Sequence, residues 1–207
     1  MRVKICGARR PKDVAACLEA GADHVGFNFV ARSRRRVTPA QARALAADLP
    51  AGVGVGVFED AEPAFILAIC AEAGLLVAQV HGPLSLQGAA EIAQRLRLIR
   101  ALPGADRDCP ALSAWAPHVT AFLFDGPRPG SGTPWATERA LGPTRAGRPT
   151  FLAGGLRPRT VAAAVARFQP GGLDVASGVE GPDGHIDPAR VRAFTQAARA
   201  AASSTPA

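Results

Sequence analysis

Short apolar segments alternate regularly with helix-like segments along this chain, and this alternation restricts its possible folds more than any other feature. Eight apolar segments have the length of buried strands: Val3–Cys6, His24–Phe29, Val53–Phe58, Leu75–Val80, Arg97–Ala101, Val119–Asp125, Thr150–Ala153 and Leu173–Ala176. The helix-like segments are Pro11–Ala20, Pro39–Leu49, Glu62–Ala73, Ala89–Arg95, Pro110–Trp115, Arg157–Phe168 and Pro188–Ala201. Thr38 can cap the second of them, with Gln41 placed for a capping box. Strands that alternate with helices form a parallel sheet, and eight such units predict closure into a (β/α)8 TIM barrel. We expect one domain over residues 1–201 and a disordered tail over 202–207; a doubly wound open sheet is the alternative.

Composition excludes several classes of protein. The chain has 207 residues, of which 48% are hydrophobic and 20% charged, as in a globular domain with a sizeable core. No apolar run approaches the roughly 20 residues of a membrane helix, and the amino terminus shows no signal peptide, so we expect a cytoplasmic protein. Four cysteines without metal-ligand spacing predict neither a zinc site nor a disulfide framework. Cys17 and Cys70 fall on apolar helix faces and are expected in the core.

The net charge of +7 comes mostly from arginine, and only Arg32–Arg36 forms a dense basic cluster. A basic excess suits nucleic acid or small anionic ligands. The cluster has no interleaved aromatic residues to stack on bases. We therefore expect a solvated or anion-binding loop there and no nucleic-acid partner.

Two glycine-containing loops near the end of the chain predict a phosphate site. Gly154 and Gly155 follow the seventh strand, and Ser177 and Gly178 follow the eighth. Glycine lets the backbone approach a ligand closely, and free N–H groups at a helix start attract anions. In barrels of this kind, the loops after strands seven and eight are the usual phosphate site.

Cys6 and Asp125 end the first and sixth strands, on nearly opposite sides of the barrel. A thiolate can take a proton from carbon, and a carboxylic acid can give one to oxygen. The spacing alone also fits a small strand residue and a turn-forming aspartate. His81 ends the fourth strand and could either line the site or hydrogen-bond to the backbone. Strand alternation places Lys4 on the same face as Cys6, where we expect it to pair with Asp174.

Several motifs, in one order, resemble the phosphoribosylanthranilate isomerase family over most of the chain. They are Lys4–Gly7, Gly26–Phe29, Ser33–Val37, Val57-Phe58, Gln79–Gly82, Phe124-Asp125, Leu152–Leu156 and Asp174–Glu180. The resemblance implies an isomerase of tryptophan biosynthesis that rearranges N-(5′-phosphoribosyl)anthranilate without a cofactor or metal. Its partner would be a small phosphorylated substrate, and whether the chain is a monomer or a homodimer stays open.

The same resemblance assigns roles to individual residues. Cys6 would be the general base at C2′ and Asp125 the general acid at the furanose oxygen. For these roles we expect a nearby positive group or helix N-terminus to lower the pKa of Cys6, and partial burial to raise the pKa of Asp125. Arg35 would hold the anthranilate carboxylate, a task suited to guanidinium. Gly154, Gly155, Ser177 and Gly178 would hold the phosphate. His81 and Gly132 are further residues that could line the site.

The chain departs from the family pattern in three places. Pro129 replaces the first glycine of the strand-six loop, which reads Pro129–Gly132; Arg34 stands where proline is usual, and Ile186 where lysine is frequent. None of these changes removes a proposed catalytic group, although we expect closure of the strand-six loop to differ from the family's.

Three other functions compete with this one. Indole-3-glycerol-phosphate synthases depend on barrel lysines, whereas this chain has only Lys4 and Lys12. Histidine-pathway isomerases carry aspartate at the top of strand one, where this chain has Cys6. A nonenzymatic anion-binding or nucleic-acid-binding barrel would use the arginine cluster, and turnover of phosphoribosylanthranilate would distinguish it from an enzyme.

Overall fold

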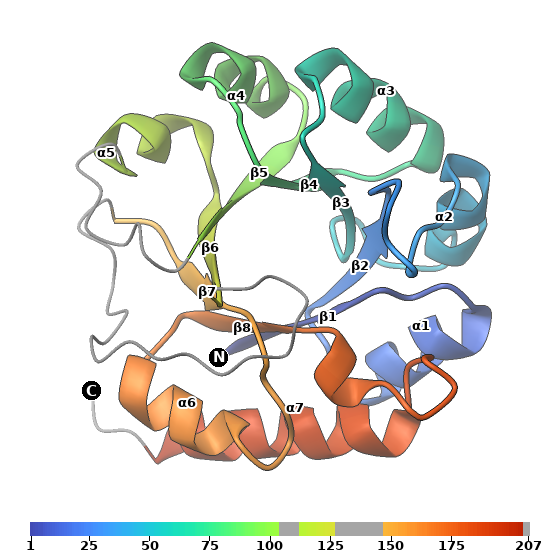
Figure 1. Cartoon of the computed structure of the whole chain (residues 1–207), viewed down its shortest axis with the longest axis vertical. Helices are drawn as coiled ribbons and strands as arrows, with labels where there is room; N and C mark the ends of the chain where they lie inside the picture. Colours follow the sequence, from blue (N-terminus) through green and yellow to red (C-terminus); the bar gives the residue numbers. More distant parts are fainter. Residues whose placement is uncertain (104–111, 127–146, 205–207) are drawn as a thin grey trace.

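The computed structural model describes residues 1–103, 112–126 and 147–204, and their strands form a closed barrel (Figure 1). The eight strands are β1 (Arg2–Cys6), β2 (His24–Asn28), β3 (Gly54–Glu59), β4 (Val77–His81), β5 (Arg97–Pro103), β6 (Ala121–Asp125), β7 (Thr150–Leu152) and β8 (Gly172–Val175). Neighbouring strands pair in parallel, in chain order. Because β8 also pairs with β1, with Lys4 opposite Asp174, the barrel is confirmed and the open sheet is excluded.

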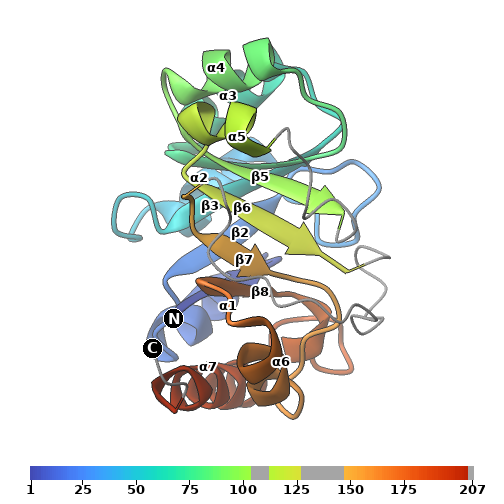
Figure 2. The same ribbon diagram turned by 90° about the vertical axis from the view of Figure 1, so that its left-hand side faces the viewer.

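Helices surround the barrel on its outer face (Figure 1). They are α1 (Pro11–Glu19), α2 (Pro39–Ala46), α3 (Pro63–Ala73), α4 (Leu86–Ala93), α5 (Leu112–Trp115), α6 (Val161–Phe168) and α7 (Pro188–Ser203), with short 3-10 turns η1 (Ala116–His118) and η2 (Ser177–Val179). The amino terminus and the end of α7 lie away from the strand tips, at the opposite end of the barrel (Figure 2). The strand tips are therefore left to the loops that build the site.

Several boundaries differ from those expected, for local physical reasons. Helix α4 begins three residues early, because the Ser85 side chain accepts a hydrogen bond from Gly88 N–H and caps it. Strand β4 begins at Val77 because Gly74, in the left-handed region, and the Leu75 N–H bond to Cys70 still belong to the end of α3. Helix α6 begins at Val161, since Arg157 and Thr160 form a separate turn.

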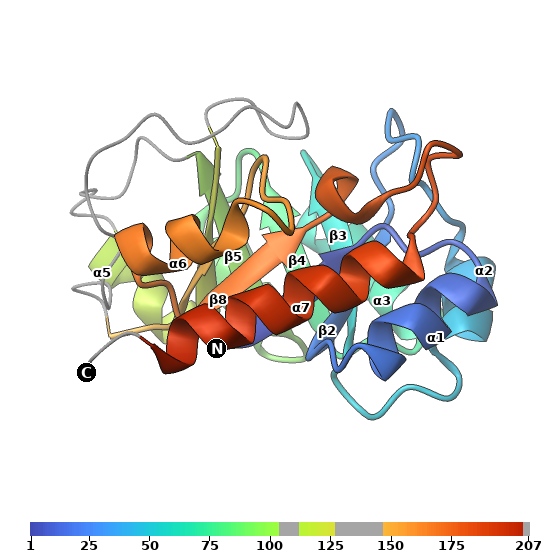
Figure 3. The same ribbon diagram turned by 90° about the horizontal axis from the view of Figure 1, so that it is seen from below.

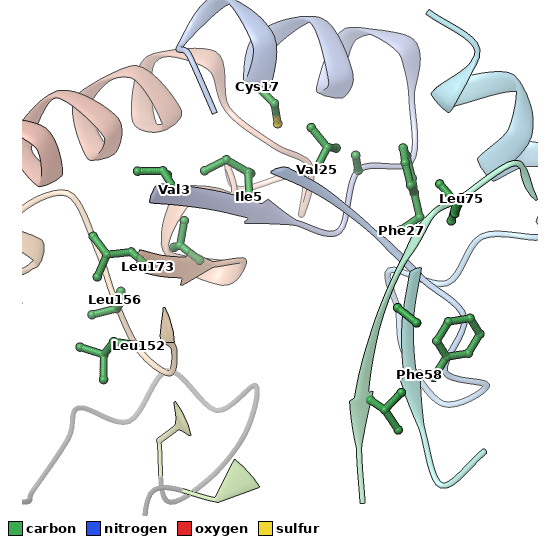
Figure 4. Packing of buried hydrophobic residues seen from close by; sticks show 14 of the residues in the cluster. Val3, Ile5, Cys17, Val25, Phe27, Phe58, Leu75, Leu152, Leu156 and Leu173 are labelled. Atoms are coloured by element: carbon green, nitrogen blue, oxygen red, sulfur yellow. The ribbon is translucent and has the colours of Figure 1, made fainter. Parts of the chain in front are cut away.

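The core has an outer and an inner apolar layer. The outer layer lies between sheet and helices, where Val3, Ile5 and Val25 face Cys17 of α1 (Figure 4). Cys17 and Cys70 are both fully buried in this layer, as expected. The inner layer fills the lower barrel with small and aliphatic side chains around Phe151. Burial of each large side chain contributes about 1.5–3 kcal/mol, and these side chains fill the barrel interior below the strand tips.

The last helix braces the barrel from outside. Helix α7 runs beneath β8, beside α1 and α6 (Figure 3). It buries Val191, Phe194 and Ala198. The helix continues to Ser203, so Ala202 and Ser203, assigned to the tail from the sequence, are helical; residues 205–207 lie outside the described part. No helix within the described ranges is long and apolar enough to span a membrane.

Candidate active site

A cavity of about 530 Å³ opens at the carboxyl ends of the strands. It collects the site residues predicted from the sequence that the structure describes. These are Cys6, Arg35, His81, Asp125, Gly154, Gly155, Ser177 and Gly178. Gly132 and the Pro129–Gly132 loop lie outside the described residues. The volume falls in the range typical of small-molecule sites.

The first strand brings Lys4 and Cys6 to the barrel interior. Lys4 is fully buried, and its Nζ donates a 2.8 Å hydrogen bond to Oδ1 of Asp174 on β8. The predicted pair is therefore present. A buried ammonium needs such a partner, and the bond joins the first strand to the last. It also holds a positive charge next to the Cys6 thiol.

Burial raises the pKa of the Cys6 thiol, and the Asp174 carboxylate adds to this, although Lys4 and Arg35 act in the opposite direction. The expectation that nearby cations would bring the pKa of this thiol below its ordinary value is therefore wrong for the free protein. The cause is desolvation, since the thiolate loses more hydration inside the barrel than the two cations return. Cys6 is a thiol at neutral pH before a ligand binds.

Asp125 ends β6 and lies inside the cavity, only 8% exposed. Burial and the Asp174 carboxylate raise the pKa of Asp125 to about 6. A hydrogen bond of 2.8 Å from Gly126 N–H to Oδ1 limits this rise. The direction agrees with the expectation for a general acid.

The loops after β7 and β8 form an anion cradle. Gly154 has φ of +90°, and a Cβ there would overlap the Gly126 backbone nitrogen. Gly178 lies directly against the Leu156 carbonyl, so the two loops touch. Among the described residues, no acceptor takes a hydrogen bond from the N–H groups of Gly154, Gly155, Ser177 or Gly178. Four free N–H groups facing one cavity are suited to a phosphate.

Arg35 reaches the cavity wall already paired with a carboxylate. Its Nε donates to Glu180 Oε1 at 2.6 Å and its Nη2 to Oε2 at 3.1 Å. Glu180 is only 6% exposed and also bonds Arg34. Two guanidinium groups against one carboxylate leave a net positive charge at the cavity mouth, which can attract an anionic substrate group. The Glu180 pairing orients Arg35.

Two carboxylates offset part of the positive charge of the arginine cluster. Arg32 binds Glu59 through Nε and Nη2, at 3.1 and 2.5 Å, while Arg34 and Arg35 share Glu180. Three of the cluster's arginines thus face carboxylates around the cavity mouth. This arrangement favours the anion-binding loop over a nucleic-acid surface.

His81 lines the cavity and bonds a side chain. The Gln79 amide Nε2 lies 2.8 Å from His81 Nε2, and burial lowers the pKa of His81 to about 4. The backbone-bonded alternative considered for its imidazole is therefore not what the structure has. Arg100 of β5 fixes the strand end, since it donates to the Val80 carbonyl at 3.0 Å and to the Gly82 carbonyl at 2.5 Å.

Three contributors carried no assigned role in the sequence analysis: Glu180, Gln79 and Arg100. Glu180 and Gln79 were visible only as members of motifs. Their partners, Arg35 and His81, were named, but Arg35 and Glu180 both lie in loops, where strand alternation relates no pair. Arg100 lies in a strand whose apolar pattern is weak. This weak pattern was the only sign in the sequence that the strand carries a functional polar residue. Within the described ranges, no group of three or more His, Cys, Asp or Glu side chains could hold a metal ion.

A phosphate cradle that faces a buried acid and a thiol suits a reaction in which protons move along a phosphorylated sugar. Fold and site together define a sugar-phosphate isomerase of the (β/α)8-barrel class. Comparison identifies the family. Residues 3–197 match the family model described as N-(5'phosphoribosyl)anthranilate (PRA) isomerase, and the chain belongs to this family.

Individual relatives agree with this. The chain is 40% identical over 212 residues to N-(5'-phosphoribosyl)anthranilate isomerase of Chlorobium luteolum, covering 97% of this chain and 98% of that protein. The crystal structure of the Thermus thermophilus enzyme matches with a TM-score of 0.82 and 38% identity, over 97% and 99% of the two chains. A further isomerase structure, in complex with reduced 1-(o-carboxyphenylamino)-1-deoxyribulose 5-phosphate, matches with a TM-score of 0.84 and 32% identity, again over 97% and 99%.

Proposed function

We propose that this chain converts N-(5′-phosphoribosyl)anthranilate into 1-(2-carboxyphenylamino)-1-deoxyribulose 5-phosphate, using Cys6 as base and Asp125 as acid. One observation carries the proposal: in a member of this family, the predicted acid, base and anion-binding groups line a single cavity. The substrate is a small phosphorylated molecule, like the ligand of the related complex. The cytoplasmic location stays a prediction.

The phosphate is the group that positions the sugar. The N–H groups of Gly154, Gly155, Ser177 and Gly178 bind its oxygens between β7 and β8, and Arg35 binds the anthranilate carboxylate near β2. With both ends held, the ribose lies over the barrel centre between Cys6 and Asp125. Positioning of this kind replaces the search for a reactive geometry.

The reaction then needs two proton transfers. Protonated Asp125 gives its proton to the furanose oxygen while the substrate nitrogen lone pair forms a C1′=N bond, and the C1′–O bond breaks. The Cys6 thiolate removes the C2′ proton, so the electron pair of that C–H bond forms a C1′=C2′ bond and returns charge to nitrogen. The resulting enol-amine becomes the ketone when C1′ gains a proton and the C2′ hydroxyl gives up its own proton to water. No electron leaves the substrate, so no redox cofactor is needed.

The test is a direct assay. Phosphoribosylanthranilate is fluorescent and its fluorescence disappears on isomerisation, so purified protein should abolish the signal catalytically. Cys6→Ser and Asp125→Asn should each reduce turnover by about 10²–10⁴ while circular dichroism stays unchanged. A folded wild-type protein without turnover would contradict the function, and Cys6→Ser at the parent rate would contradict the base.

A further inference from the structure

Gln79 is an unexplained polar residue on the cavity wall. Its side chain is on β4, inside the barrel, with 2% exposure. The amide Nε2 contacts His81, but Oε1 has no hydrogen-bond partner among the described residues. Leaving a buried acceptor unpaired destabilises the folded chain, so a barrel built only for stability gains nothing from glutamine here.

The amide is held in place through His81. His81 takes one end of it, and the backbone around His81 is fixed by Arg100, which is itself buried and stacks on Trp115 at 5.0 Å. If the amide is turned over, nitrogen and oxygen exchange places, and one polar atom still faces away from His81 without a partner. Either way, Gln79 keeps a hydrogen-bonding group for something in the cavity.

The position of β4 limits what that partner can be. β4 stands four strands from β8 in the closed barrel, so Gln79 lies across the cavity from the anion cradle. A phosphate held by the cradle places the sugar between the two sides. The acceptor Oε1 needs a donor, and the sugar's donors are its hydroxyl groups.

Gln79 and His81 carry no charge at pH values near neutrality. Glutamine does not titrate, and burial with the nearby Lys4 ammonium holds the pKa of His81 far below neutrality, against the pull of Asp174 and Glu59. A neutral pair can bind a hydroxyl without disturbing the proton balance of Cys6 and Asp125.

We propose that Gln79, held by His81, binds a ribose hydroxyl of the substrate opposite the phosphate and so makes the site specific for a hydroxylated sugar chain. The inference rests on the proposed function. It assigns Gln79 as a binding and specificity residue and His81 as the residue that positions it.

The experiment combines a variant with altered ligands. The ligands are reduced 1-(2-carboxyphenylamino)-1-deoxyribulose 5-phosphate and its analogues with single sugar hydroxyls replaced by hydrogen, and affinity is measured by calorimetry. Gln79→Met should weaken binding of the full ligand about 3- to 10-fold, the range of one neutral hydrogen bond. For one deoxy analogue, the wild type and the variant should bind equally. The wild type should also bind that analogue more weakly than it binds the full ligand. This second comparison uses no variant, so it does not depend on whether a variant folds.

Thr195→Val is the matched control. Thr195 on α7 is also 2% exposed with an unpartnered Oγ1, but it is not part of the cavity. Both substitutions remove an orphaned buried oxygen, so neither should lower the melting temperature by more than about 3 °C. Only Gln79→Met should change affinity. Loss of stability without loss of affinity in Gln79→Met would make the residue structural.

The outcomes separate this inference from the proposed function. The inference alone is overturned if the wild type binds the full ligand and turns over substrate while Gln79→Met binds the full ligand and every analogue as tightly as the wild type does. A wild type that neither binds the ligand nor converts substrate overturns the function, and the inference with it.

Discussion

At the scale of single residues, Cys6 and Asp125, the proposed base and acid, hold their protons in the opposite arrangement from the one the proposed reaction uses. In the free protein, Asp125 with a pKa of about 6 is mostly ionised at pH 7, and the raised pKa of Cys6 keeps its thiol protonated. The reactive form has one proton moved from Cys6 to Asp125. Because both forms carry the same number of protons, their ratio does not depend on pH between the two pKa values.

This gives the pH dependence of kcat/KM a definite form. We expect it to rise with a midpoint at about pH 6, where Asp125 titrates, and to stay level until the Cys6 thiol ionises above its ordinary value. Stopped assays in constant-ionic-strength buffers from pH 4.5 to 9.5 measure it. An acidic limb near pH 4 would mean that Asp125 is not the group titrating in the free enzyme.

Asp125 should also reduce stability when it ionises. Its pKa is higher in the folded chain than the ordinary 3.8, so the folded state is most favoured below that value and loses stability as pH rises through about 6. The two-unit difference corresponds to about 3 kcal/mol at pH 8. Asp125→Asn keeps the acceptor for Gly126 N–H without the charge. Calorimetry should show that this variant melts at a higher temperature than the wild type at pH 8 and at the same temperature at pH 3.5. If the variant and the wild type melt at the same temperature at both pH values, burial is not the cause of the raised pKa.

Arg35 should contribute to ligand binding through the carboxylate. Arg35→Ala should weaken the carboxylate-bearing product analogue by about 2–5 kcal/mol, as for a well-desolvated charge pair, and an analogue without the carboxylate much less. Arg32→Ala is the control, since Arg32 pairs with Glu59 in an exposed setting. It should change neither affinity by more than about 0.5 kcal/mol. Equal losses for both ligands in Arg35→Ala would place the arginine's role elsewhere.

At the scale of elements, helix α2 depends on a reciprocal cap. Thr38 Oγ1 accepts from Gln41 N–H at 3.2 Å, and Gln41 Oε1 accepts from Thr38 N–H at 2.8 Å. Thr38→Ala should cost about 1 kcal/mol in urea unfolding. Lys12→Ala, in the exposed part of α1, should cost less than half of that. A neutral Thr38→Ala would show that packing alone holds the start of α2.

The same elements show what a sequence can and cannot reveal. The Thr38 cap, the Lys4–Asp174 pair and the cysteine positions in the core follow from local chemistry and alternation, and the structure confirms them. The state of Cys6 did not follow, because it depends on the sum of burial, Lys4, Asp174 and Arg35. The Glu180 pairing did not follow either, because Arg35 and Glu180 lie in loops outside the strands, where neither alternation nor strand order relates them. Local rules predict elements, whereas the proton and charge balance of the site needs coordinates.

At the scale of the whole molecule, closure of the barrel brings a charge pair into its interior. Lys4 and Asp174 lie 170 residues apart and meet only when β8 reaches β1. Asp174 in turn raises the pKa of both Asp125 and Cys6, so closure and site chemistry share one residue. A chain that fails to close therefore loses both its fold and the electrostatics of its site.

The Lys4–Asp174 pair should stabilise the barrel less than the loss on removing Lys4 alone suggests. Lys4→Met leaves the Asp174 carboxylate buried without its cation and should cost about 3–5 kcal/mol in urea unfolding. The double variant Lys4→Met/Asp174→Leu removes both charges and should recover most of that loss, because two apolar side chains pack without any desolvation penalty. Val3→Ala in the same strand is the control for a packing defect, which Asp174→Leu should not repair. If the double variant is less stable than Lys4→Met alone, then the ion pair itself, and not the avoidance of an unpaired charge, stabilises the closed barrel.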